Sequence, residues 1–226
     1  MATYNGQPFI SEQVESILGE MGPYDELVIS DNGSSDGTLA YLDSLEDERV
    51  KLIHCTIPGV ISNFENAIGY AEGEYIILSD QDDVWLAGRL QKALKALTTA
   101  DLSAVSLFIV DEKLNLTGKK IAPRGGFLAT LIRNSYPGCS LAFRREVLDW
   151  VLPFPKQIAM HDWWIVLICL ARGKVDHTGE SYILYRRHGG NASDTGEKSN
   201  FSRIQQLMLR INMLICLLRR YLANRK

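Results

Sequence analysis

Apolar side chains in the first hundred residues recur at two alternating spacings. Helical spacing marks the segments 10–18, 39–45, 64–71 and 90–97. Short unbroken apolar runs, which are typical of buried strands, lie between them at 26–30, 50–53 and 74–78. Because strands that alternate with helices form βαβ units, we predict an α/β fold in which helices flank a mostly parallel central sheet.

The pattern becomes looser beyond residue 100. Apolar runs predict further strands at 104–110, 140–143 and 181–185, and further helices at 145–151 and 163–171. No internal repeat or low-complexity linker divides the sequence. We therefore expect one domain over residues 1–200, followed by a separate helix over residues 201–226.

The C-terminal segment has a composition of its own. Between residues 198 and 226 there are seven basic residues and no acidic one. Apolar residues recur there at helical spacing over 204–218. This pattern predicts a basic amphipathic helix, which can lie on an anionic membrane surface. A helix that packs on the body of the protein, with its basic face in water, explains the pattern equally well.

Composition narrows the choice of protein class. The 226 residues, 46% of them hydrophobic, suffice for one large domain with a sizeable core, and the net charge of −3 argues against nucleic-acid binding. The sequence contains no apolar run of about 18 residues, so it predicts no transmembrane helix. It also shows no signal peptide. The four scattered cysteines argue against a zinc site and fit reduced thiols. We expect a cytoplasmic protein, either free or peripheral at the inner face of the membrane.

Three carboxylates, those of Asp80, Asp82 and Asp83, follow the predicted strand at 74–78. Negative charges this close together repel one another unless a positive group lies among them. Carboxylate oxygens suit Mg²⁺, Mn²⁺ and Ca²⁺, and the carboxyl ends of strands are where open α/β sheets bind ligands. The cluster therefore indicates a bound divalent metal. A solvated acidic loop is the alternative interpretation.

Four further motifs accompany this cluster in a fixed order. The first two are Ala-Thr-Tyr-Asn-Gly at 2–6 and Ser-Asp-Asn-Gly-Ser-Ser-Asp-Gly-Thr at 30–38. The third is Pro-Gly-Cys-Ser-Leu-Ala-Phe-Arg-Arg-Glu at 137–146, and the fourth is His-Asp-Trp-Trp at 161–164 with Tyr-Arg-Arg-His at 185–188. Together with Ser-Asp-Gln-Asp-Asp-Val-Trp at 79–85, they resemble the family 2 glycosyltransferases, which have the GT-A fold. The acidic motif is similar to that of bacterial rhamnosyltransferases that build cell-surface polysaccharide.

The resemblance implies roles for the acidic cluster. The family's DxD motif maps onto residues 80–82, so Asp82 is expected to bind a divalent metal, Mn²⁺ or Mg²⁺. Asp80 is expected to face the metal or the donor ribose, and Asp83 to touch the donor sugar. His188 would complete the metal sphere or contact the diphosphate, although a lone histidine is often structural. Arg186 or its neighbour could bind a phosphate oxygen, or both could be exposed strand charges.

The resemblance also implies a nucleotide pocket. Asp31 is expected to accept a hydrogen bond from the imide N–H of uracil or thymine, because an ionised carboxylate only accepts. The alternative is a loop residue that stabilises its own turn. Thr3, Tyr4 and Asn5 would form the other wall of the pocket. A further pair, Gly138 and Cys139, would line the part that holds the donor sugar.

The catalytic base is expected at Asp162. Family 2 enzymes invert the anomeric centre by direct displacement, and one carboxylate removes the proton of the acceptor hydroxyl. By resemblance that carboxylate is the second residue of the His-Asp pair at 161–162. A helix that starts there would favour its charged form. The alternative is that Asp162 only caps the helix.

One part of the family pattern is missing. Members normally have a full strand before the Ala-Thr-Tyr-Asn-Gly turn, whereas this sequence begins at Met1. We therefore expect the first strand to be absent and its neighbours to expose their edges and apolar surface. That expectation keeps open a second hypothesis, a non-catalytic nucleotide-sugar-binding module or a truncated, inactive glycosyltransferase.

The main hypothesis is an inverting, metal-dependent glycosyltransferase with a UDP- or dTDP-sugar donor, in which rhamnose is favoured by the resemblance alone. The acceptor is expected to be a saccharide or a lipid-linked saccharide in the synthesis of cell-surface polysaccharide. Residues 201–226 would make peripheral membrane contact. A third hypothesis, a nucleotidyltransferase, is disfavoured because residues 2–9 lack the Gly-rich, basic phosphate loop of those enzymes.

Overall fold

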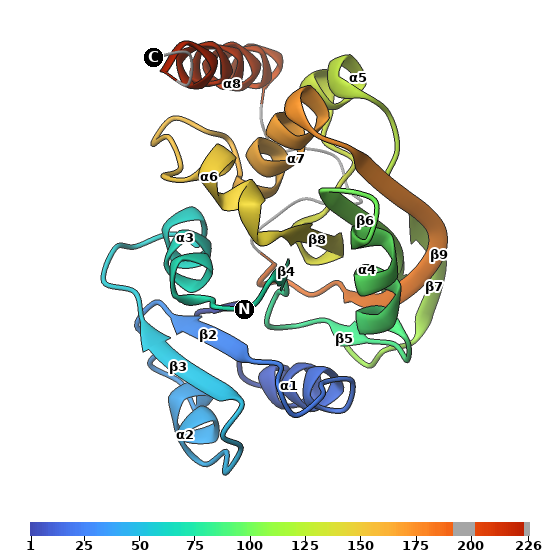
Figure 1. Cartoon of the computed structure of the whole chain (residues 1–226). Coiled ribbons are helices and arrows are strands. Elements are labelled where there is room, and N and C mark those ends of the chain that lie inside the picture. Colours follow the sequence, from blue (N-terminus) through green and yellow to red (C-terminus); the bar gives the residue numbers. More distant parts are fainter. Residues whose placement is uncertain (192–201, 224–226) are drawn as a thin grey trace.

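A computed structural model describes residues 1–191 and 202–223. Helices cover both faces of two β-sheets, so the predicted α/β class is confirmed (Figure 1). The nine strands of the described residues are β1 (Ala2–Thr3), β2 (Leu27–Asp31), β3 (Val50–His54), β4 (Tyr75–Ile77), β5 (Val84–Trp85), β6 (Leu102–Val110), β7 (Leu116–Ile121), β8 (Leu141–Arg144) and β9 (Val175–Arg186).

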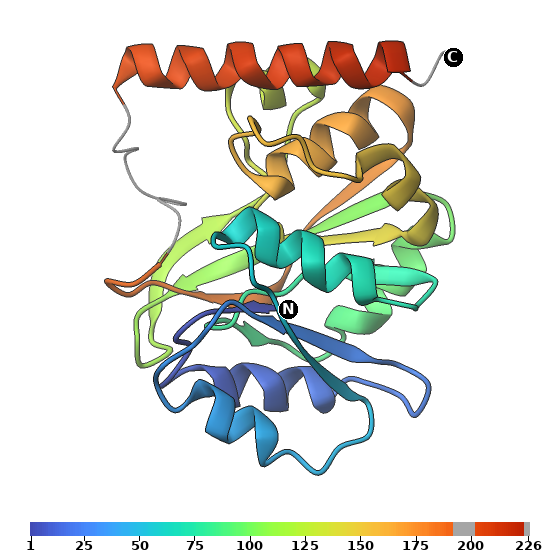
Figure 2. The ribbon, with the colours of Figure 1, turned by 90° about the vertical axis from the view of Figure 1, so that its left-hand side faces the viewer.

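The first sheet is built from the amino-terminal half. Strands β1, β2 and β3 lie in that order and are all parallel. Helices α1 (Ile10–Leu18) and α2 (Thr38–Asp43) cover one face, and α3 (Val60–Tyr70) covers the other (Figures 1 and 2). Each helix turns an apolar stripe inward, as the helical spacing predicts; Val14 on α1 and Phe64 on α3 are almost completely buried.

The second sheet is larger and mixed in direction. Its order is β4-β8-β6-β9-β5, and β7 pairs with β6. Strand β6 runs parallel to β9 but antiparallel to β7 and β8. The expectation of a mostly parallel sheet therefore holds for the first sheet only. Strand β8 runs antiparallel to both of its neighbours, β4 and β6.

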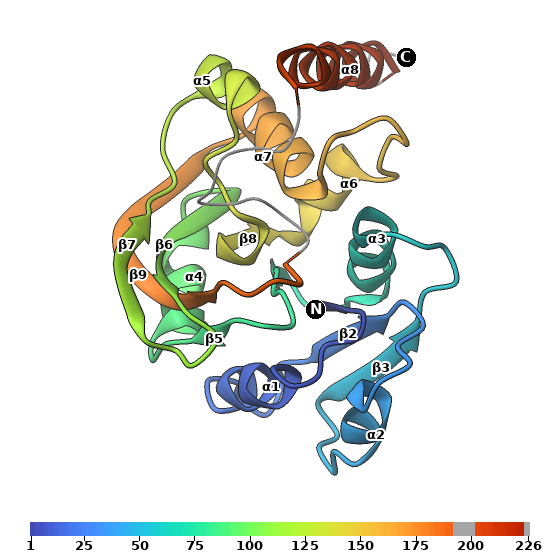
Figure 3. The same cartoon turned by 180° about the vertical axis from the view of Figure 1, so that it is seen from behind.

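The remaining helices pack around the second sheet. They are α4 (Arg89–Leu97), α5 (Phe127–Ile132), α6 (Leu148–Val151), α7 (His161–Arg172) and α8 (Arg203–Ala223), with short 3₁₀ turns at Gly138–Ser140 and Arg145–Val147. Helix α7 is the most buried of them and forms the centre of one apolar core with α3 and β8. Helix α8 lies across α5, α6 and α7, on the side far from the first sheet (Figures 2 and 3). Within the described residues, no helix is both long and apolar enough to cross a membrane.

Three elements have no counterpart in the sequence pattern. Strand β5 has only two residues, and β7 is a largely exposed strand of sequence Leu-Thr-Gly-Lys-Lys-Ile, so neither carries the apolar alternation of a half-buried strand. Helix α5 spans six residues, which is less than two turns. Each is too short or too polar for periodicity to reveal.

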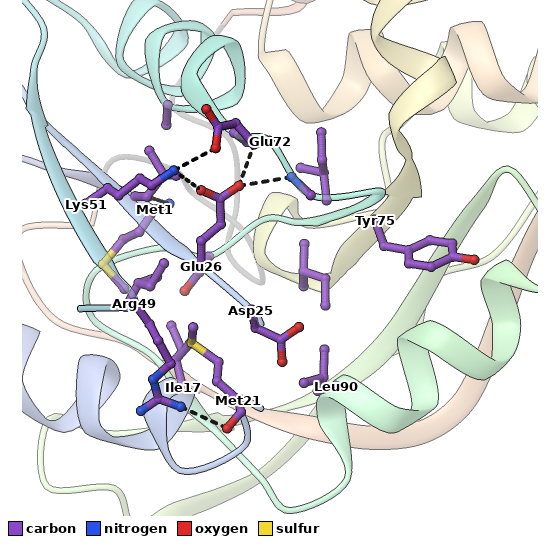
Figure 4. A pocket seen from close by; sticks show the side chains of 18 of the residues that line it. Met1, Ile17, Met21, Asp25, Glu26, Arg49, Lys51, Glu72, Tyr75 and Leu90 are labelled. Atoms are coloured by element: carbon purple, nitrogen blue, oxygen red, sulfur yellow. Dashed lines mark hydrogen bonds and ion pairs between the residues drawn. The ribbon is translucent and has the colours of Figure 1, made fainter. Parts of the chain in front are cut away.

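A gap separates the two sheets. The sequence led us to expect that the full first strand would be absent, and only the two-residue strand β1 is present; it pairs with β2 at Ser30 and Asp31. Among the described residues β4 pairs on one side only, with β8. A cavity of about 680 Å³ lies between these strands and is lined by Met1, Val28 and Ile76 together with residues of α1, α3 and α4 (Figure 4). At one end Lys51 bridges Glu26 and Glu72 at 2.8 and 2.9 Å (Figure 4).

Candidate functional site

Loops from both sheets meet at a second cavity of about 890 Å³. Its wall combines the turn after β1, the loop after β2, the start of α3, the loop after β4, the start of α7 and the segment after β9. The sequence-predicted residues in its lining are Thr3, Tyr4, Asp80, Asp82, Gly138 and Asp162. The other predicted site residues, Asn5, Asp31, Asp83, Cys139 and His188, lie outside the lining.

The acidic cluster lies at the end of β4 and divides into two parts. Asp80 and Asp82 line the cavity, whereas Asp83 is fully buried behind it. Ligand atoms of Asp80, Asp83 and Cys139 lie within 4.8 Å of one another. Burial, followed by repulsion from Asp82 and Asp162, raises the pKa of Asp80 to about 7. Burial, followed by repulsion from Asp82 and Asp80, also raises the pKa of Asp83.

His188 and Asp82 are brought together although they lie 106 residues apart in the sequence. The His188 Nε2 atom lies 2.8 Å from Asp82 Oδ2, and the Asn191 amide donates to the same oxygen at 3.0 Å. Behind them Arg186 is 2% exposed, and its Nε donates to the backbone oxygen of Asp82 at 2.8 Å. Its guanidinium also pairs with Glu12. Arg186 therefore positions the acidic loop instead of reaching the cavity.

Gln81, which the sequence analysis did not single out, holds the amino-terminal turn in place. Its Oε1 accepts from the Thr3 hydroxyl at 2.6 Å and from the Tyr4 backbone N–H at 2.8 Å. Asn5 faces the other way, and its side chain accepts from the Ser35 backbone N–H at 2.8 Å. The turn thus couples the loop after β4 to the loop after β2. Its role was not visible in the sequence because a glutamine between aspartates has no distinctive spacing.

Asp31 is fully buried at the end of β2. Its Oδ1 accepts from the backbone N–H groups of Gly33 and Ser34, both at 2.9 Å, and its Oδ2 accepts from the Ser34 hydroxyl. Gly33 has φ of +84°, a left-handed conformation that glycine adopts without strain. These contacts match the turn-stabilising alternative. Its neighbours Asn32 and Gly33, not Asp31 itself, line the cavity.

Replacing Asp31 with Ala is expected to lower the stability of the fold by about 3 kcal/mol, because three donors lose a charged acceptor. Thermal unfolding measures the effect. Asp43→Ala, at an exposed position on α2, is the matched control and is expected to change stability by less than about 0.5 kcal/mol. An unchanged melting temperature for Asp31→Ala, with pyrimidine binding lost, would instead support direct contact with a base.

Asp162 occupies the first turn of α7 and is 8% exposed. Its Oδ2 accepts from the Asn134 side-chain amide at 3.1 Å, and its Oδ1 accepts from the Trp163 backbone N–H at 2.6 Å. Burial raises the pKa of Asp162 to about 6, although these donors oppose the rise. The group is thus mostly ionised at pH 7 and can still take up a proton, which is the requirement for a general base.

His161 is a buried neighbour of the predicted base and was not assigned a role from the sequence. Its ring stacks on Phe64 of α3 at 4.0 Å between centroids, and burial lowers its pKa to about 3. The ring is therefore neutral at physiological pH. Both ring nitrogens are buried without a hydrogen-bond partner, although the residue lines the cavity. No sequence signal separates such a histidine from an ordinary core residue.

Comparisons with known proteins agree with this architecture. The model of the family described as "Glycosyl transferase family 2" matches residues 1–151. A crystal structure of S. aureus TarS in complex with UDP-GlcNAc superposes with a TM-score of 0.69, at 16% identity, covering 92% of this chain and 68% of that one. The mannosyltransferase PcManGT from Pyrobaculum calidifontis, in complex with GDP-Man and Mn²⁺, superposes with a TM-score of 0.63 at 22% identity. This match covers 84% of this chain and 56% of that one.

Curated relatives point the same way. An uncharacterized glycosyltransferase of Nostoc sp. is 28% identical over 88% of this chain and 68% of its own length. The dTDP-rhamnosyl transferase RfbG of Shigella flexneri is 25% identical over 90% of this chain and 78% of its own length. The Escherichia coli protein WfgD, named a UDP-Glc:alpha-D-GlcNAc-diphosphoundecaprenol beta-1,3-glucosyltransferase, is 26% identical over 74% and 68%. From the family match and these likenesses, the chain belongs to glycosyl transferase family 2 and has the GT-A fold.

Proposed function

We propose that this protein transfers a sugar from a nucleotide-sugar donor to an acceptor hydroxyl with inversion at the anomeric carbon. The observation that supports this most is the shared cavity: Asp162 on one wall faces the same space as Asp80 and Asp82 on another. Direct displacement needs a base on the acceptor side and charge compensation on the leaving-group side. Two separate acidic walls around one cavity meet that requirement.

Asp162 is the proposed base. It takes the proton of the acceptor hydroxyl as that oxygen bonds to the anomeric carbon and the diphosphate departs with the electron pair of the broken bond. Asn134 positions the carboxylate by donating to Oδ2, which leaves the second lone pair of that oxygen for the proton. The helix N-terminus at α7 stabilises the ionised form.

A divalent cation, Mn²⁺ or Mg²⁺, fits the acidic wall. Burial, followed by repulsion from Asp82 and Asp162, raises the pKa of Asp80 to about 7, and a cation at this wall would offset that repulsion. Asp82, Asp80 and His188 are the proposed ligands, because carboxylate and imidazole groups suit such metals. When bound, the metal would act as a Lewis acid on the diphosphate.

We propose UDP or dTDP as the carrier of the donor sugar. Thr3, Tyr4 and Asn32 offer a polar wall for the nucleotide, and Gly138 lets backbone approach the sugar closely. Rhamnose and glucose are the candidate sugars because relatives are named for transferring them, and a diphosphoundecaprenol-linked saccharide is the candidate acceptor for the same reason. We assign this activity to residues 1–200.

Thermal-shift measurements with nucleotide diphosphates test the donor site. UDP or dTDP with Mn²⁺ is expected to raise the melting temperature, because a ligand that binds only the folded state stabilises it. EDTA, or the variant Asp82→Ala, is expected to abolish the metal-dependent part of the shift. GDP and ADP are the controls for base preference. A shift that is equal with and without metal would contradict the metal site.

A non-catalytic nucleotide-sugar-binding module is the second candidate. The gap between β2 and β4 favours it, because an unfilled cavity beside the site weakens the support of the catalytic loops. This candidate predicts nucleotide binding with no donor hydrolysis or transfer.

A further inference from the structure

The outward face of α8 is apolar along its whole length. Its six main side chains, which recur every three to four residues, are Ile204, Leu207, Ile211, Leu214, Leu218 and Tyr221. They are 41–76% exposed. The opposite face of α8 is the one that packs on the protein, through Met213, Cys216 and Leu217. The exposed stripe is therefore not a by-product of packing, since the helix already has a separate buried face.

Helix α5 extends this surface. Leu128 and Ile132 are 73% and 64% exposed, and the Arg210 Nε on α8 donates to the backbone oxygen of Ile132 at 2.7 Å. The two helices are thus in direct contact and lie on the same side of the molecule (Figure 3). We call their exposed apolar residues the α5–α8 surface. Large exposed apolar patches mark interaction sites in folded proteins.

The charges on α8 itself have one sign. Helix α8 contains four arginines and no acidic residue. Arg210 and Arg220 hold the helix on the body through backbone oxygens, while Arg203 and Arg219 are exposed near its two ends. An apolar face bordered by exposed arginines matches a membrane interface, where acyl chains meet anionic headgroups.

We propose that the α5–α8 surface docks on an anionic lipid bilayer, with α8 lying flat in the interface. A second copy of the chain fits less well. Antiparallel pairing of two α8 helices by a two-fold axis would place Arg203 of one copy near Arg219 of the other, so that like charges repel. Phosphate headgroups neutralise those same arginines.

The docked orientation brings the catalytic cavity close to the lipid. Asn134 follows α5 by two residues and contacts Asp162, and the Trp163 indole donates to the Thr130 backbone oxygen of α5 at 2.7 Å. The same short helix thus contributes to the docking surface and supports the proposed base. Resting on the proposed function, this placement favours an acceptor that carries its saccharide on a lipid, presented at the bilayer surface.

Vesicle co-sedimentation of the full chain tests the docking without any sugar nucleotide, so its outcome is independent of the proposed activity. Binding is expected to vesicles that contain phosphatidylglycerol and to be much weaker with phosphatidylcholine alone. The double variant Leu207→Glu/Leu218→Glu is expected to lower the partition coefficient by about tenfold or more, because carboxylates enter the apolar interface. The double variant Arg203→Gln/Arg219→Gln is expected to lower the partition coefficient on anionic vesicles by about fivefold for each arginine removed. Its binding to phosphatidylcholine vesicles is expected to stay the same.

Leu116→Glu is the matched control, since Leu116 is 65% exposed on β7 and lies outside the α5–α8 surface. It is expected to leave binding unchanged, and unfolding curves confirm that every variant is folded. Equal binding by the wild type and the Leu207→Glu/Leu218→Glu variant would overturn the proposal. So would a failure of the wild type to bind the anionic vesicles, whether the chain is a monomer or a dimer in sedimentation equilibrium.

Discussion

Replacing Asp162 with Asn is expected to reduce the turnover number of sugar transfer by about 10²–10⁴-fold, the usual contribution of a positioned general base. Asparagine keeps the shape of the side chain and can still accept from the Trp163 backbone N–H, whose hydrogen bond to Asp162 is 2.6 Å long. It cannot take up the acceptor proton. Donor binding, measured by thermal shift with UDP or dTDP, is expected to change little because the nucleotide wall lies across the cavity.

The pH profile gives a second readout of the same group. Burial holds the pKa of Asp162 at about 6, above its ordinary value, so the carboxylate is ionised above pH 6 and protonated below it. Only the ionised form can act as a base. The rate for the wild type is therefore expected to rise between pH 5 and 7 and then level off. The Asn variant is expected to lack this rise in its residual activity.

Asp149→Asn is the matched control for this experiment. Asp149 lies exposed on α6, outside the cavity lining, so the same chemical change there is expected to leave turnover and its pH dependence intact. Should the Asp162→Asn variant retain wild-type turnover, the base must be another group, and Asp162 would be reduced to a capping residue of α7. A loss of turnover that matches a loss of folded protein would likewise remove the argument.

Part of the convergence of the motifs was predictable from strand topology. The residues after β2 and β4 lie at the ends of strands, where open α/β sheets bind ligands, although the two strands belong to different sheets. Short apolar runs located β2 and β4 well, and turn residues located their ends. The assignment of Thr3, Asp82 and Asp162 to one site came from the family resemblance, and all three line the same cavity.

The direction of a side chain at a strand end was not predictable. Asp31 and Asp83 both follow apolar strands in acidic motifs, yet both turn inward and are fully buried. Asp31 turns back onto its own loop, where it accepts from the Ser34 hydroxyl, whereas Asp83 accepts from the distant Arg186 backbone N–H. Arg186 lies 103 residues from Asp83 in the sequence. Local spacing carries no information about such a contact.

Adding a five-residue apolar, β-branched segment ahead of Met1 is expected to raise the melting temperature by about 10 °C or more. In a parallel pair of strands, moving one residue along one strand moves the pairing one residue in the same direction along the other. Ala2 pairs with Ser30. The two residues before Met1 would therefore lie beside Val28 and Leu27, with the open edge of β4 on the other side. Their side chains would enter the cavity of about 680 Å³ between the sheets. Each buried Val or Ile contributes about 1.5–3 kcal/mol.

The amino group of Met1 adds an electrostatic term. Its nitrogen is buried and donates to the Val28 backbone oxygen at 2.7 Å, and burial lowers its pKa from 8.0 to about 5. Folding therefore releases a proton between pH 5 and 8, so stability falls as the pH drops through this window. The buried amine lowers the free energy of unfolding by about 1.4 kcal/mol at pH 7, and this loss approaches about 4 kcal/mol below pH 5. An extension replaces the amine with a neutral peptide N–H that keeps the hydrogen bond.

A Gly-Ser extension of the same length separates the effect of the buried amine from the effect of filling the cavity. It removes the buried amine but supplies neither apolar side chains nor strand propensity, so it is expected to abolish the loss of stability between pH 8 and 5 while leaving the cavity largely unfilled. Only the β-branched extension is expected to stabilise the fold further at pH 8, where the amine term is small. If the two extensions gave equal melting temperatures at pH 8, the space between β2 and β4 would not be a strand site, and the gap would be a tolerated feature of this fold.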